Sequence, residues 1–164
     1  MFEHFAQIPN IQAIKESTRD VSNVTRLKNR FKDRFKILCG VDTLAYEELT
    51  MGADGWVAGL VDAFPTETVA IYRLIKAGKY HDALKIYRWF LPLLELDTHA
   101  KFVQYIKLAA AQTGLGSEYV RAPRLLLTGN EREKILNTIN TAMSARDQII
   151  NELDFALILK AVEL

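Results

Sequence analysis

The stretch IQAIKESTRD, residues Ile11 to Asp20, decides how the first part of this chain folds. A short apolar run, Ile11 to Lys15, gives way there to a polar segment that can start a helix. Two further apolar runs follow, FKILCG at Phe35 to Gly40 and GWVAGLV at Gly55 to Val61, with amphipathic segments between the runs. This alternation predicts a βαβαβ unit, and near-continuous apolar strands indicate a parallel sheet covered by helices.

The segments between the runs have helical spacing. Asp20 or Ser22 can cap the first helix, whose apolar residues recur at steps of three and four and therefore share one face: Val21, Val24, Leu27 and Phe31. The second helix is expected from about Thr43 to Met51, and Gly52 ends it. The sequence thus supplies two helices to cover one sheet.

From Pro65 onward the pattern is helical almost to the end of the chain. Helices are expected from Pro65 to Gly78, from Tyr80 until Pro92 kinks or ends it, and from about Thr98 to Thr113. Thr113 to Gly129 is rich in turn residues and predicts a loop. A long terminal helix is expected to start at Asn130 and to run towards Leu164.

The composition excludes several classes of protein. The 21 Lys and Arg residues nearly balance the 20 Asp and Glu residues, so nucleic acid is not an expected partner. No apolar run is long enough to cross a membrane, no secretory signal precedes the first strand, and the single Cys39 fits a reducing compartment. We therefore expect a cytoplasmic protein that binds a small metabolite. The three histidines lack metal-ligand spacing, and no metal site is expected.

Lys15 is the residue with the clearest chemical potential. It stands at the carboxyl end of an apolar strand, the edge at which barrel and open α/β enzymes place their active sites. An apolar surrounding disfavours the charged ammonium, and the neutral amine can attack a ketone to form a Schiff base. A solvated lysine at a strand end is the alternative from spacing alone.

Four segments in order resemble the family of dihydrodipicolinate synthases and N-acetylneuraminate lyases. IPNIQAIKESTRD, Ile8 to Asp20, resembles the strand whose lysine bonds pyruvate or another 2-oxo acid. FKILCGVD, Phe35 to Asp42, resembles the next strand, and GADGWVAGLVDAFP, Gly52 to Pro65, is similar to the last barrel strand. VRAPRLLLT, Val120 to Thr128, resembles a late loop with an Arg-x-Pro-type signature. The resemblance extends to about Met143.

The resemblance implies roles for five residues. Lys15 matches the Schiff-base lysine, Gly40 the glycine of the substrate pocket, and Val57 the strand residue whose backbone carbonyl faces the substrate. Ser17 and Asp42 match positions that contact the distal part of the substrate in some members. No cofactor is implied.

Four residues depart from the family pattern and bear on the substrate. Arg19 replaces a small residue, Val41 an acidic one, Ala58 a serine and Asp62 an asparagine. The combination of STRD, GWVAGLVDAFP and LELDTHAKFVQYIKLA looks most like the branch with hydroxypyrroline-carboxylate deaminases. A keto-deoxy sugar acid dehydratase would look similar.

The resemblance also implies an α/β fold with only the last three strands of a (β/α)₈ barrel in residues 1–78, and a C-terminal helical region in residues 79–164. A whole barrel needs about 250 residues. The family's carboxylate-binding loop and proton-relaying tyrosine have no match, so we expect a truncated chain that is weakly active or inactive alone. The expected partner is a second copy in a homo-oligomer or a complementing N-terminal half. A non-catalytic fragment or interaction module is the alternative function.

Overall fold

The computed structural model of the chain describes residues 1–153 and residue 158. These residues form two compact units, Met1–Ala58 and Gly59–Leu164. The first unit contains the sheet, and the second is helical.

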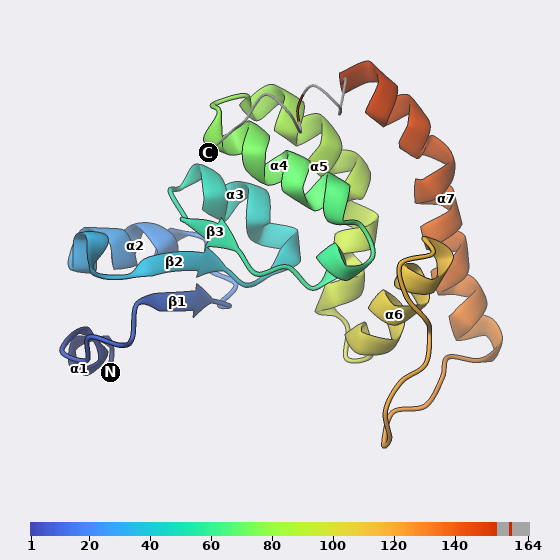
Figure 1. The fold of residues 1–164 in the computed structure, drawn as a ribbon, viewed down its shortest axis with the longest axis horizontal. Coiled ribbons are helices and arrows are strands. Elements are labelled where there is room, and N and C mark those ends of the chain that lie inside the picture. The colour runs from blue at the N-terminus through green and yellow to red at the C-terminus, as the bar shows by residue number, and fades with distance from the viewer. Residues whose placement is uncertain (154–157, 159–164) are drawn as a thin grey trace. The chain divides into compact units, whose positions relative to one another are not determined.

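The first unit is the predicted βαβαβ arrangement. Its three parallel strands follow the order β1-β2-β3, and Figure 1 shows them beside α2 and α3. The elements are β1 (Ala13–Glu16), α2 (Ser22–Phe31), η1 (Lys32–Arg34), β2 (Lys36–Cys39), η2 (Asp42–Leu44), α3 (Ala45–Thr50) and β3 (Gly55–Trp56). The α/β class and the parallel sheet predicted from the sequence are confirmed.

The third strand is shorter than the run Gly55 to Val61 suggested. Only Gly55–Trp56 is strand, and the backbone N–H of Val57 makes one more bond, to the carbonyl of Cys39, at 2.9 Å. β2 ends at Cys39, so the chain beyond Val57 has no further strand residue to pair with in this unit. Leu60–Asp62 instead form a 3-10 turn, η3.

The sheet has one covered and one open face within the first unit. Side chains alternate along a strand, and the register aligns Lys15 with Leu38 and Leu38 with Gly55. These residues share the open face. The opposite face packs under α2 and α3, and its buried residues are Val24, Leu27, Ile37, Cys39, Ala45 and Leu49. Lys15 therefore points away from the hydrophobic core.

Arg34 holds a short N-terminal helix, α1 (Phe2–Ala6), which the sequence did not predict. Its guanidinium donates to the carbonyl oxygens of Ala6 at 2.8 Å, Ile8 at 2.7 Å and Ile11 at 2.8 Å. It also lies over the ring of Phe35, 4.6 Å from the centroid. With a longer bond to the Phe5 carbonyl oxygen, at 3.4 Å, one side chain thus donates to four carbonyls that precede β1.

The second unit is built from helices around an aliphatic and aromatic core. α4 packs against α5, α5 against α7, and α6 against α7. The helices are α4 (Pro65–Lys76), α5 (Tyr80–Leu94), α6 (Phe102–Gln112) and α7 (Gly129–Leu153), with the 3-10 turn η4 (Glu95–Thr98) after α5. Fully buried side chains at their contacts include Ile71, Leu74, Ile86, Phe90, Leu93, Leu108 and Ile139.

The predicted ends of the helices are mostly close to those observed. α5 runs two residues past Pro92, because a proline in the last turn removes only one backbone donor, and then tightens into η4. α6 starts at Phe102, later than the expected Thr98, since Glu95–Thr98 belong to η4. Within the described residues, no helix is long and apolar enough to cross a membrane. The predicted end of the terminal helix, near Leu164, lies outside the described residues.

The boundary between the two compact units lies at Ala58 and Gly59, before α4. The predicted boundary at residues 78 and 79 assumes a (β/α)₈ barrel, in which the helix α4 belongs with the strand before it. This boundary stays a prediction. The assignment of the three strands to a partial barrel is likewise a proposal, taken up below.

Candidate active site

Lys15 lies near the end of β1, on the open face of the first unit's sheet. Its side chain is exposed, and it is aligned across the sheet with Leu38 of β2. Glu16, the next residue, is 3% exposed because the strand pleat turns it to the helix-covered side. The pleat therefore separates a reachable amine from a buried carboxyl on adjacent residues.

Gly40 lies directly against Lys15 and Ser17. A Cβ atom added at Gly40 would stand 2.7 Å from Cε of Lys15 and 2.5 Å from the carbonyl oxygen of Glu16, and it would overlap Oγ of Ser17. Contacts under 3.0 Å are too short for a real Cβ atom, so only glycine fits beside this lysine without a shift. Three of the five predicted site residues are thus brought together: Lys15, Ser17 and Gly40.

Val57 and Asp42 occupy different surroundings. Val57 directly follows β3 and is 44% exposed. Asp42 is fully buried in η2, where its Oδ1 accepts a hydrogen bond from the indole N–H of Trp56 at 3.0 Å. In the described unit the Asp42 carboxylate is therefore directed to the neighbouring strand, and its predicted contact with substrate stays a proposal.

A buried acidic pair lies on the other side of the sheet and was not singled out from the sequence. Glu48 of α3 is 0% exposed and lies with Glu16 and Cys39 under the helices. Its position could have been found, because Ala45, Glu48 and Leu49 recur at three and four residues on the buried face of α3. Glu16 could have been found from the alternation with Lys15.

Burial is the main influence on the ionisation of this group. It raises the pKa of Glu48 to about 7, while the Cys39 thiol lowers that pKa and the Glu16 carboxyl raises it further. Burial also raises the pKa of the Cys39 thiol well above its ordinary value, with the Glu48 charge adding to the effect. Both groups are therefore held towards their neutral forms.

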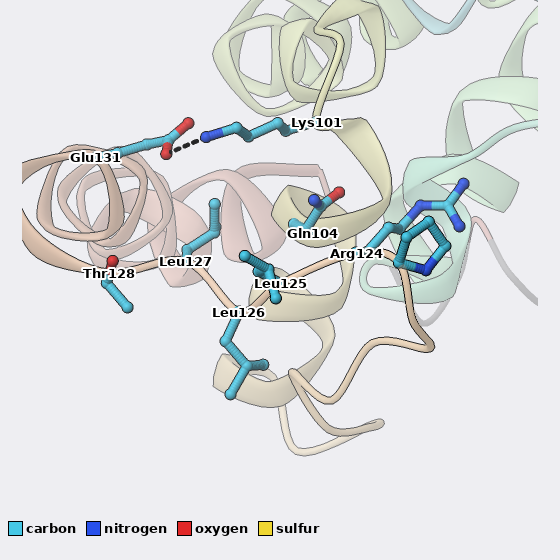
Figure 2. A pocket seen from close by; sticks show the side chains of 9 residues that line it. Lys101, Gln104, Arg124, Leu125, Leu126, Leu127, Thr128 and Glu131 are labelled. Atoms are coloured by element: carbon cyan, nitrogen blue, oxygen red, sulfur yellow. Dashed lines mark hydrogen bonds and ion pairs between the residues drawn. The ribbon is translucent and has the colours of Figure 1, made fainter.

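The second unit has surface hollows of its own. Figure 2 shows one of about 450 Å³ between α6, the start of α7 and the loop of residues 123–128. An ion pair of 2.6 Å between Lys101 and Glu131 closes one end, and Leu125, Leu126 and Leu127 line the middle. Arg124 lines this hollow and a second one, of about 440 Å³, with Lys107 and Arg121. The predicted Arg-x-Pro-type loop therefore forms much of the surface between α6 and α7.

No group of three or more His, Cys, Asp or Glu side chains that could hold a metal occurs in residues 1–153 or at residue 158. The chemistry that the described arrangement offers is that of an amine. Lys15 has a hydroxyl from Ser17 and the bare backbone of Gly40 beside it. A carbonyl compound could reach this group from the open face of the sheet.

Comparison with known protein families identifies the family to which this chain belongs. The model of the dihydrodipicolinate synthetase family matches residues 1–142. The chain belongs to this family. The resemblance inferred from the four segments is thereby confirmed, and the match covers every predicted site residue from Lys15 to Val57.

Individual family members agree with this assignment. The 4-hydroxy-tetrahydrodipicolinate synthase of Exiguobacterium sibiricum is 33% identical over 122 residues, 74% of this chain and 41% of that protein. The enzyme of the same name from Wigglesworthia glossinidia brevipalpis is 32% identical over 136 residues, 80% of this chain and 46% of that protein. The chain spans about half the length of the curated relatives it matches or slightly less.

Solved structures give the same result for the fold. The 4-hydroxy-tetrahydrodipicolinate synthase of Methylacidiphilum fumariolicum SolV superimposes with a TM-score of 0.77 at 26% identity, covering 94% of this chain and 51% of that one. The dihydrodipicolinate synthase of Aquifex aeolicus gives a TM-score of 0.78 at 22% identity, covering 86% of this chain and 48% of that one. The three strands and the helices after them thus have counterparts in these enzymes.

Proposed function

We propose that this chain carries the Schiff-base half of a lyase that acts on pyruvate or a related 2-oxo acid, with Lys15 as the nucleophile. The observation that carries the proposal is the placement of Lys15 on the open sheet face, against Gly40 and Ser17, in a member of the dihydrodipicolinate synthetase family. The three strands would be the last three of a (β/α)₈ barrel, whose interior would be the face that bears Lys15.

The lysine chemistry follows from the amine alone. The neutral Nζ of Lys15 adds to the keto carbon of the substrate, and loss of water gives the imine, which takes up a proton from solvent to become the protonated imine. The imine withdraws electrons from the adjacent carbon, which eases loss of a proton there or cleavage of a neighbouring bond. Gly40 would let the substrate carbon approach Lys15, and Ser17 would donate a hydrogen bond to an oxygen in the distal part of the substrate.

The remaining predicted residues would have supporting roles. The Val57 carbonyl, at the end of β3, would face the substrate from the strand farthest from Lys15 in the sheet order. Asp42 would act through Trp56, to which it is bonded, and so would fix the end of β3 beside the pocket.

The substrate class rests on the family and is held at the level of a 2-oxo acid or the imine derived from one. Arg19, Ala58 and Asp62 depart from the pattern expected of a dihydrodipicolinate synthase, which favours a hydroxypyrroline-carboxylate deaminase or a keto-deoxy sugar acid dehydratase. No organic cofactor or metal is needed for either reaction by this route.

A partner would be required to complete the site. β1 is an edge strand, and within the first unit the open face carries Lys15 without a covering element. Relatives are about twice as long as this chain. We propose that a complementing N-terminal half, or a second copy of the chain, pairs with β1 and closes the face.

Borohydride trapping tests the function. The purified chain is reduced in the presence of pyruvate, and peptide mapping by mass spectrometry locates any added mass. The expected result is an adduct on Lys15, with the mass of pyruvate less one water and plus two hydrogens. Lys36 is the matched control, because it is exposed on the same open face of the neighbouring strand. Lys15→Ala should abolish the adduct, and Lys36→Ala should leave it unchanged.

The alternative is a non-catalytic interaction module, and the same experiment separates the two. A folded chain that forms no adduct, even with a supplied N-terminal half of a relative, would favour the module. Adducts spread over several lysines, unaffected by Lys15→Ala, would show that Lys15 is not the nucleophile.

A further inference from the structure

Glu16 and Glu48 form a buried acidic pair that the lysine chemistry does not use. The two residues are 3% and 0% exposed. Three of their four carboxyl oxygens are buried without a hydrogen-bond donor among the described residues: Oε2 of Glu16 and both oxygens of Glu48. Neither residue forms an ion pair with a described lysine, arginine or histidine. Two buried carboxylates in this state would be strongly unfavourable.

A single proton shared by the two carboxyls removes the cost of burying two negative charges. Glu16 and Cys39 are the neighbouring side chains that act most strongly on the ionisation of Glu48. Two carboxylates can only accept hydrogen bonds, whereas a protonated carboxyl donates one. With a proton on Glu48, the repulsive contact becomes a hydrogen bond to Glu16.

We propose that Glu48 is a positioning residue for Lys15: its protonated carboxyl donates a hydrogen bond to Glu16 and so fixes the end of β1 from which Lys15 and Ser17 project. The role of the contact in the chain's fold is argued from the burial of the two carboxyls and from their unpartnered oxygens. Its consequence for reactivity rests on the proposed function of Lys15.

The second oxygen of Glu16 shows how the contact reaches the site. Oε1 accepts the backbone N–H of Thr18 at 3.0 Å and the side-chain amide of Asn23 on α2 at 3.0 Å. Ser17 lies between Glu16 and Thr18 in the chain, so the bond from the Thr18 N–H to the Glu16 carboxyl restrains the backbone of Ser17. A hydrogen bond that holds the Glu16 carboxyl on the helix-covered side therefore also fixes the turn that carries Ser17 on the open face.

The surrounding charges favour the protonated form. Burial and the negative charges of Glu16 and of Glu47, next to Glu48 on α3, raise the pKa of Glu48, and they outweigh the neutral Cys39 thiol of β2, which lowers it. Asp42 raises the pKa of the Cys39 thiol. The positioning contact is thus present below about pH 7, the pKa of Glu48, and it is lost as the pH rises through that value.

Infrared spectroscopy tests the proton without reference to catalysis. The wild-type chain should show the carbonyl stretch of a protonated carboxylic acid at pH 6, and the band should fade as the pH rises through about 7. Glu48→Gln should lack the band. Glu47→Gln is the matched control on the same helix and should keep it. Absence of the band from the wild type at pH 6, or its persistence in Glu48→Gln, would overturn the proposal.

Amide hydrogen exchange of the peptide from Lys15 to Thr18 tests positioning. After correction for intrinsic rates, exchange in the wild type should accelerate above pH 7, and in Glu48→Gln, whose amide still donates to Glu16, it should not. Glu48→Ala should exchange faster at every pH. Should that variant fail to fold, the contrast between the wild type and Glu48→Gln decides. Equal pH profiles for these two would overturn the positioning role.

Borohydride trapping then measures the consequence for Lys15. Trapping by the wild type should weaken above pH 7, relative to Glu48→Gln, and Glu48→Ala should trap ~10-fold more slowly, since small misplacements of a reacting group have effects of at least this size. Trapping that is equal in all three chains would restrict Glu48 to the fold and overturn its role in reactivity. No trapping by any chain, even with a supplied N-terminal half of a relative, with the band and exchange as expected, would refute the proposed function and leave the fold contact supported.

Discussion

Gly40 lies so close to Lys15 that a methyl group on its Cα would strike Cε of the lysine at 2.7 Å and a backbone carbonyl at 2.5 Å. The carbonyl belongs to β1 and cannot rotate away as a flexible side chain could. Gly40→Ala should therefore destabilise the chain by about 1–3 kcal/mol, as overpacking usually does, and should reduce borohydride trapping at Lys15. Chemical denaturation and peptide mapping measure the two effects.

Gly55 provides the matched control for this substitution. It lies on the same open face, but a Cβ there would meet only Cδ2 of Leu38, at 3.1 Å, and that side chain can move by a few tenths of an ångström. Gly55→Ala should be close to neutral in both measurements. Equal effects of the two substitutions would argue against a specific contact between Gly40 and Lys15.

Asp54 is expected to link the stability of the first unit to pH. It accepts hydrogen bonds from Nζ of Lys28 at 2.5 Å and from the backbone N–H of Ile37 at 2.8 Å. Burial alone would raise the pKa of Asp54, but these two bonds outweigh it and the pKa is lowered. The stabilisation is then present at neutral pH and is lost as the pH falls through the lowered pKa.

The substitution Asp54→Asn isolates this effect. It should lower the free energy of unfolding by about 1 kcal/mol at pH 7, and the difference from the wild type should shrink as the pH falls below about 4 towards the lowered pKa of Asp54, where its carboxyl becomes protonated. Urea titrations at pH 7 and pH 3 provide the measurement. Asp33→Asn, on an exposed residue of η1, should leave stability unchanged. A difference that grew at low pH would contradict the assignment.

Arg34 should determine the stability of the N-terminal helix α1. Replacing Arg34 with Met keeps the apolar stem over Phe35 but removes donors to four carbonyls. We expect a loss of about 1–3 kcal/mol and faster amide exchange over residues 2–11. Arg30→Met is the control, since its pair with Glu3 is exposed on both sides, and it should cost less than about 1 kcal/mol. Unchanged exchange in Arg34→Met would refute this role.

Tyr105 is hydrogen-bonded to Glu131, one of the residues that line the hollow shown in Figure 2. Burial raises the pKa of Tyr105 to about 12, and the Glu131 carboxylate, which accepts its hydroxyl at 2.8 Å, adds to the effect. Glu131→Gln should lower the tyrosine pKa part of the way towards 10, because burial remains. Spectrophotometric titration, with Tyr105→Phe to assign the signal, measures the shift. Glu133→Gln, exposed on the same helix, should cause none.

The sequence predicted those parts of the fold that rest on regular spacing. The apolar runs at residues 11–15 and 35–40 became strands, and the three- and four-residue spacing of Val24 and Leu27 became the buried face of α2. The length of β3 could not be read from its run, because the run continues into η3 after its partner strand ends. A strand extends only as far as a neighbouring strand pairs with it, and one apolar run does not show where its neighbour ends.

The sequence predicted one part of the site, the orientation of Lys15, and missed another, the buried acidic pair. The side of the sheet on which Lys15 lies follows from alternation, and the structure places Gly40 directly against it, while the roles of both residues stay predictions. The acidic pair was missed, since its members are 32 residues apart and a carboxyl is expected to be solvated until its neighbours are known. Only the packing of α3 on β2 brings Glu48 to the strand that carries Lys15.

The opposite orientations of Lys15 and Glu16 also protect the strand against slippage. A shift of β1 by one residue along β2 would turn every side chain to the other face. Lys15 would then enter the helix-covered side beside Cys39, and Glu16 would enter the open face, where nothing in the first unit replaces its bonds to Thr18 and Asn23. β1 has only four residues and a partner on one side, so this short strand keeps its alignment largely through the unlike chemistry of two adjacent side chains.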